Sequence, residues 1–102
     1  MRPPEDFTRI VGKKRYSTKT ATLIAGDDYW DGHNHERHGR NTFLYKTARG
    51  AFFTVTLTQW QGEQDILSPI TQDEAIGLYE GPLIEHRADY AEAFPSVTVE
   101  DA

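Results

Sequence analysis

The stretch RNTFLYKTARGAFFTVTLTQW at residues 40–60 constrains the fold more than any other part of the chain. Residues 53–58 alternate apolar side chains with threonines, which is the two-residue period of a β-strand with one buried face. Residues 41–47 are rich in the aromatic and β-branched types that suit a pleated surface. Gly50 lies between the two segments and can take the positive φ of a short turn. The stretch therefore predicts two antiparallel strands joined by a tight turn.

Weaker signals predict the elements around this hairpin. Residues 8–16 predict a smaller hairpin, and the apolar run at 21–25 predicts a further strand. Thr71 and Glu74 fit a helix capping box, in which a hydroxyl and a carboxylate each accept a backbone N–H. An amphipathic segment at 83–94 predicts a second helix. We therefore expect an α+β fold, a small antiparallel sheet of about four short strands with one or two C-terminal helices packed on one face.

The remaining segments predict loops and chain ends. Residues 27–40 and 61–68 show neither a strand period nor a helix period, so each predicts a loop. A chain of 102 residues is long enough for one domain with a modest core. We expect this domain to cover residues 8–95, with a flexible arm at 1–7 and a short acidic tail at 96–102.

Composition narrows the classes of function. No run approaches the roughly 20 apolar residues of a membrane span, and the N-terminal residues lack the apolar part of a signal peptide, so we expect a cytoplasmic protein without a membrane partner. The absence of cysteine excludes disulfides and thiolate chemistry. The net charge of −5 conceals an asymmetry, because residues 1–20 carry six cations and two acids whereas residues 61–102 carry one cation and ten acids. Such oppositely charged ends suggest charged binding partners.

Several short motifs are spread over residues 10–94. Residues 14–21 read KRYSTKTA and precede an apolar strand, residues 44–47 read LYKT before a glycine turn and two phenylalanines, and a capped acidic helix follows at 69–79. Together these motifs resemble a family of small uncharacterised proteins found on bacterial phages, plasmids and integrative elements. The resemblance implies an origin on a mobile element, where small acidic proteins often bind and block host machinery.

The chain departs from that family at two places. Ser17 stands where the family usually has aspartate, and the loop at 27–40 is rich in histidine, which the family loop is not. The resemblance supplies no catalytic residues to transfer. What it implies is therefore a type of origin and a type of partner rather than a reaction.

Charge, aromatic side chains and the resemblance together predict a non-enzymatic protein-binding module. Its expected partner is a host or defence-system protein, so an inhibitor of the anti-CRISPR kind is the concrete form, with acids that compete for a basic groove. Tryptophan and tyrosine would anchor the interface, although solvation of helix faces explains the acids equally well. The predicted binding residues are Tyr29, Trp30, Trp60, Asp73, Glu74, Glu80, Glu85, Asp89 and Glu92. A monomer and a homodimer paired at an edge strand both stay open.

A DNA-binding accessory protein is the alternative function. It would use the basic N-terminal hairpin, because cations there can contact phosphates beside one aromatic ring. Edge strands also carry such residues simply to prevent aggregation between sheets. The predicted DNA-binding residues are Lys13, Lys14, Arg15 and Lys19.

A metal-binding loop is the second alternative. His33, His35 and His38 have side chains that bind zinc, nickel or copper, although a solvated loop explains them more simply. No serine lies in a nucleophile elbow and no glycine-rich loop has the context of a phosphate cradle. We therefore expect neither an enzyme nor a cofactor.

Overall fold

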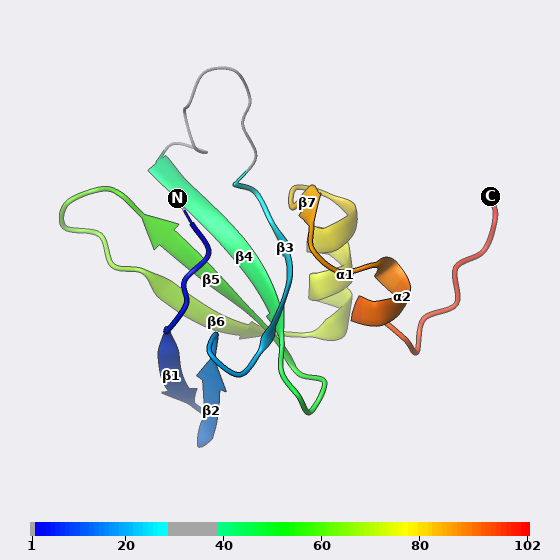
Figure 1. The fold of residues 1–102 in the computed structure, drawn as a ribbon, viewed down its shortest axis with the longest axis horizontal. Helices are drawn as coiled ribbons and strands as arrows, with labels where there is room; N and C mark the ends of the chain where they lie inside the picture. The colour runs from blue at the N-terminus through cyan, green and yellow to red at the C-terminus, as the bar shows by residue number, and fades with distance from the viewer. Residues whose placement is uncertain (1, 29–38) are drawn as a thin grey trace.

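The computed structural model describes residues 2–28 and 39–102 of the chain. Seven strands and two helices follow one another in these residues (Figure 1). In chain order they are β1 (Thr8–Val11), β2 (Lys14–Ser17), β3 (Thr22–Gly26), β4 (Arg40–Lys46), β5 (Phe52–Thr58), β6 (Ile66–Ile70), α1 (Gln72–Glu80), β7 (Glu85–His86) and α2 (Tyr90–Ala93). Strands thus supply most of the regular structure.

The strands form two antiparallel sheets. β1 and β2 pair only with each other, and the other five strands make a second sheet in the order β6-β5-β4-β3-β7. β4 is the middle strand of the large sheet and pairs with β5 over seven residues. Because β6 and β7 are opposite edges, α1 lies on the connection that carries the chain from one edge of the sheet to the other (Figure 1).

The expected α+β fold, with about four strands and C-terminal helices on one face, is wrong, because the chain is mostly β and its helices are short. Sequence reasoning missed β6, which begins inside the loop predicted at 61–68 and contains Pro69, a residue typical of edge strands. It also merged β7 and α2 into one helix at 83–94. Leu83 and Phe94 have helical spacing, but they reach the core from two separate short segments.

The hairpin predicted around Gly50 is confirmed. Gly50 has a φ of 88°, in the left-handed region that glycine adopts without strain. Phe53 and Val55 face one side of the large sheet, whereas Phe52 and Thr54 face the other, and all four are buried. The first half of β5 is therefore buried on both faces, whereas the alternation with threonine predicted only one buried face.

Apolar side chains cover both faces of the large sheet. On one face, α1 and α2 pack around Ile24, Ala25, Leu44, Phe52, Ala75, Tyr79, Leu83, Ala93 and Phe94. On the other face, Tyr16 of β2 packs in a cluster with five residues of the large sheet, namely Phe43, Tyr45, Phe53, Val55 and Leu67. The fold therefore has three layers, namely the β1–β2 hairpin, the five-stranded sheet and the two helices.

The residues before β1 contact the hairpin layer. The Tyr45 hydroxyl donates to the Pro4 carbonyl at 3.2 Å, and burial raises the pKa of Tyr45 to about 12. The Phe7 N–H donates to the Thr18 hydroxyl at 2.8 Å, and the Thr18 N–H donates to the Phe7 carbonyl at 3.0 Å. The first bond joins the chain end to β4, and the other two join it to the β2–β3 connection. The flexibility expected of residues 1–7 stays a prediction.

The capping box of α1 is confirmed. The Thr71 hydroxyl accepts the Glu74 N–H at 3.2 Å, and the Glu74 carboxylate accepts the Thr71 N–H at 3.0 Å. The helix ends at Gly81 and buries Ala75 and Tyr79 against the sheet. Across residues 2–28 and 39–102, neither helix has the length and apolar character needed to cross a membrane.

Candidate anion-binding site

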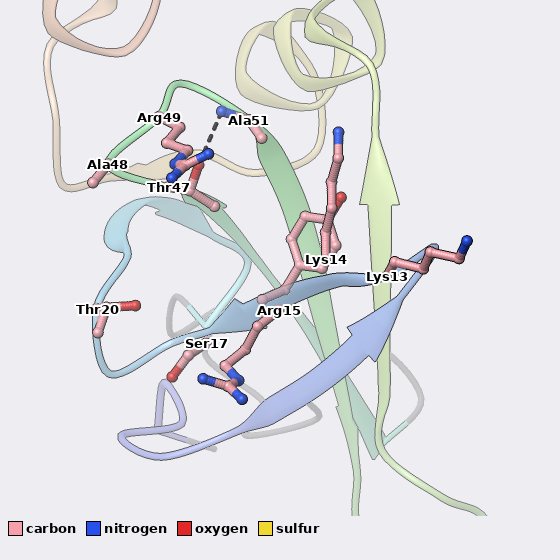
Figure 2. Close-up of a pocket in the computed structure, with 10 residues that line it drawn as sticks. Lys13, Lys14, Arg15, Ser17, Thr20, Thr47, Ala48, Arg49 and Ala51 are labelled. Carbon is pink, nitrogen blue, oxygen red and sulfur yellow. Dashed lines mark hydrogen bonds between the residues drawn. The ribbon is translucent and has the colours of Figure 1, made fainter.

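A pocket of about 540 Å³ opens between strand β2 and the turn that joins β4 to β5 (Figure 2). The residues that line it are Lys13, Lys14, Arg15, Tyr16, Ser17, Thr20, Thr47, Ala48, Arg49 and Ala51. Four of these ten residues are cations and none is an acid. The lining therefore favours an anionic ligand.

The tight turn of the β1–β2 hairpin fixes where its cations lie. Val11 pairs with Lys14, so the turn contains only Gly12 and Lys13. Their φ angles of 59° and 67° are both left-handed, as a type I′ turn requires. The hairpin predicted at 8–16 is thereby confirmed, and three consecutive cations begin inside its turn.

The four cations reach the pocket from the β1–β2 hairpin and from the β4–β5 turn, which are far apart in the sequence. Neighbouring side chains on a strand point to opposite faces, so Lys14 and Arg15 extend on different sides of β2 (Figure 2). Arg49 lies over the β4–β5 turn beside Thr47, while Lys13 points outward from the hairpin end (Figure 2). A ligand in the pocket would therefore meet Arg49 on the turn wall and Lys14 or Arg15 on the β2 wall, while Lys13 extends from the rim.

Tyr16 contributes to the inner side of the pocket without offering a ring face. It is only 9% exposed, and its ring makes a T-shaped contact with the Phe53 ring at a centroid distance of 5.6 Å. Phe53 in turn stacks on Tyr45 at 5.2 Å. The aromatic ring that the sequence placed among the hairpin cations is thus part of the core.

Neutral donors accompany the cations. The Thr47 hydroxyl accepts the Ala51 N–H at 3.0 Å, which leaves its own hydrogen available to a ligand (Figure 2). In a two-residue hairpin the residues that flank the turn form the hydrogen-bonded pair, so the next pair, Ile10 with Arg15, turns its backbone groups outward. The Arg15 N–H therefore faces the open edge of β2. By contrast, the Ser17 hydroxyl already accepts the Lys19 N–H at 3.2 Å and helps to form the β2–β3 turn.

The pocket cations have no ionic partner among the residues that the structure describes. Two other arginines differ in this respect, since Arg40 pairs with Glu63 and Arg87 forms a two-pronged pair with Asp28 at 2.8 and 2.6 Å. Hydrogen bonds from Arg87 hold the pKa of Asp28 below its usual value. Cations that serve the fold are therefore paired, whereas those of the pocket are left to solvent or to a ligand.

The six predicted acids are all exposed and come from α1, β7, α2 and the residue before α2. Three of them bind groups of the fold. The Glu74 carboxylate caps α1, the Glu80 carboxylate accepts the Tyr90 hydroxyl hydrogen at 2.8 Å, and the Glu92 carboxylate accepts the Asp89 N–H at 3.4 Å. An acidic surface exists, but half of its acids also hold the helices in place.

Trp60 does not join that acidic surface. It is 50% exposed and lies in the β5–β6 loop, which Figure 1 places at the opposite end of the long axis from α2. The other two predicted anchors, Tyr29 and Trp30, lie outside the described residues. A single interface that combines Trp60 with the acids would have to extend along the molecule.

The histidines proposed as metal ligands, His33, His35 and His38, also lie outside the described residues. In the remainder of the chain, no group of three or more His, Asp or Glu side chains is placed to hold a metal ion. The metal-binding alternative therefore stays a prediction about that loop.

Three of the four predicted DNA-binding residues line the pocket, and one cation that was not predicted joins them. Lys13, Lys14 and Arg15 line it, but Lys19 does not. Arg49 was missed, because it lies more than thirty positions away and reaches the site through the pairing of β4 with β5. Its only local signal is a cation next to the glycine of a tight turn.

Comparisons with known proteins identify no relative of this chain. No protein-family model matches the chain. Searches of curated proteins and of solved structures find no match either. The function is therefore inferred from the charge, burial and contacts of the side chains.

Proposed function

We propose that the protein is a non-enzymatic nucleic-acid-binding accessory protein that holds phosphates in the basic pocket. The observation that carries the proposal is the meeting of the β1–β2 hairpin and the distant β4–β5 turn at one pocket with four cations and no acid. Like charges repel, so this arrangement costs the folded state free energy unless an anion from outside offsets it. Phosphate oxygens bind guanidinium, ammonium, hydroxyl and backbone N–H groups, and all four kinds are present here.

The layers of the fold support the proposal despite the net charge of −5. The hairpin packs on one face of the large sheet, while α1 and α2 pack on the other. Most of the predicted acids belong to the helical layer, so a polyanion can approach the hairpin layer first. The field of an asymmetric protein orients such an approach.

Salt dependence gives the proposal a quantitative form. If all four cations contact phosphates, the logarithm of the binding constant should fall with the logarithm of salt concentration with a slope of about −3 to −4. Raising salt from about 50 to about 200 mM should then weaken binding by about 100-fold. Binding this sensitive to salt would identify phosphate contact as its main source.

The deciding experiment is a gel shift with a short mixed-sequence DNA duplex. The variant K14Q/R15Q/R49Q should bind at least about tenfold more weakly than the parent protein at about 50 mM salt. The matched control R2Q/R9Q/K19Q removes the same charge outside the pocket and should change affinity by less than about threefold. Equal losses in the two variants, or no binding by the parent, would contradict the proposal.

A second candidate is binding to a basic surface of a host or defence-system protein, as in an anti-CRISPR-like inhibitor. The exposure of all six predicted acids favours it. Asp73 and Glu85 have no side-chain hydrogen bond or ion pair among the described residues, so D73N/E85Q should leave the fold intact while it slows association with such a partner. Unchanged association in the double variant would contradict this candidate. The mobile-element origin that the motifs suggest suits either role.

A further inference from the structure

The pocket, if it binds nucleic acid as proposed above, distinguishes between double and single strands. We infer that its ligand is the phosphate backbone of a duplex, held without contact to base faces. The inference rests on the proposed function and adds the class of nucleic acid.

Binding of single strands depends on aromatic rings on which unpaired bases stack. Tyr16 is the only aromatic residue that lines the pocket. Because Tyr16 is only 9% exposed, it leaves no ring face on which a base could stack. The pocket therefore lacks the component that makes single strands bind well.

The partly exposed aromatic side chains in the described part of the chain do not supply the missing platform. Phe7 carries the Arg9 guanidinium over its ring at 4.5 Å. Tyr90 is bonded to Glu80, an acid that would repel a phosphate. Trp60 lies in the β5–β6 loop, and none of these three residues lines the pocket.

A site that works by charge alone favours the denser polyanion. Counterion release gives a slope of about −0.9 for each phosphate contact on a duplex and about −0.7 on a single strand. For four contacts the difference is about 0.8, which at about 50 mM salt corresponds to an approximately tenfold preference for the duplex. The pocket offers what a backbone-only contact needs, namely cations on two walls with an N–H donor on the β2 wall and a hydroxyl donor on the turn wall.

The test measures the affinity of the parent protein for a duplex and for each of its separated strands over a series of salt concentrations. We expect the duplex to bind about tenfold more tightly than either strand at about 50 mM salt, with the steeper salt slope. Three duplexes of unrelated sequence should bind within about threefold of one another, since phosphates carry no sequence information.

Single strands that bind as tightly as the duplex would overturn the inference and leave the proposed function standing. A wide spread among the three duplexes would overturn the claim that bases are not contacted. If no nucleic acid binds, or if K14Q/R15Q/R49Q binds as well as the parent, the proposed function itself fails and the inference fails with it. The three failures are thus distinguishable.

Discussion

The basic pocket and the acidic helical layer differ in what their charges do for the fold. In the helical layer, three of the six predicted acids, Glu74, Glu80 and Glu92, accept hydrogen bonds from the chain around them. In the pocket, neither the Lys14 side chain nor the Arg49 side chain has a hydrogen bond or ion pair among the described residues. Charges of the first kind are explained by stability. The unpaired charges of the pocket are not explained by stability, so they indicate a ligand better than the bonded acids do.

Arg87 differs from the pocket arginines in the same way, because its side chain is paired. It is the only cation of residues 61–102, and it is bonded to Asp28 through two nitrogens. The chain therefore pairs an arginine where the fold uses one, next to β7 at the sheet edge. The four predictions below test this contrast, from the largest expected effect to the smallest.

The largest effect should come from the apolar support beneath the basic pocket. Phe53→Ala removes a ring that is fully buried between Tyr16 and Tyr45, so the free energy of unfolding should fall by about 3–5 kcal/mol. Urea unfolding measures it. Ile10→Ala, at a site 65% exposed on the same layer, should change it by less than about 0.5 kcal/mol. A loss at Phe53 below about 2 kcal/mol would mean that the hairpin is held by something other than this cluster.

The next effect should come from the paired arginine. Asp28→Asn removes the negative charge of the pair. It should lower the free energy of unfolding by about 1–2 kcal/mol at neutral pH, since the pair is only partly buried. Because Arg87 lowers the pKa of Asp28, the contribution is complete above the unfolded value of about 3.9 and is lost as pH falls through the folded value.

Unfolding measured over a pH series would show this sign directly. The difference between the parent and Asp28→Asn should be largest above about pH 4 and should close at lower pH. A difference that grows as the pH falls would show that the pair does not lower the pKa of Asp28.

A smaller effect should come from the acidic layer. Thr71→Ala removes the hydroxyl that caps α1 and should lower the free energy of unfolding by about 1 kcal/mol. Thr98→Ala makes the same chemical change at an exposed site outside any helix or strand and should have no measurable effect. Equal effects at the two positions would remove the structural role assigned to the capping box.

The smallest effect on stability should come from the pocket itself. Arg15→Gln should change the free energy of unfolding by less than about 0.5 kcal/mol, because the side chain has no partner among the described residues to lose. Its direction should be towards greater stability, since three like charges remain where there were four. Thermal unfolding at low salt measures it, and a loss above about 1 kcal/mol would assign Arg15 to the fold and weaken the case for a ligand.

Local chemistry made part of this structure predictable. Gly50 and the Thr71–Glu74 box each specify a turn or a cap within a few residues, and both predictions were correct. β7 has no such signal, because its two residues become a strand only by pairing with β3. The pocket falls between these cases, since its three hairpin cations are adjacent in the sequence but Arg49 joins them only after β4 and β5 have paired.

The crossing of the chain between the two sheet edges also orders the events of synthesis. Every strand of the hairpin layer and four of the five strands of the large sheet precede α1, so they leave the ribosome before α1 and α2. Ala25 of β3 can pair with His86 only after synthesis has reached the last third of the chain. Until that residue emerges, β3 presents an unpaired edge to other nascent chains. Folding during synthesis can therefore complete the hairpin layer first, whereas the edge of β3 is covered only when β7 pairs with it.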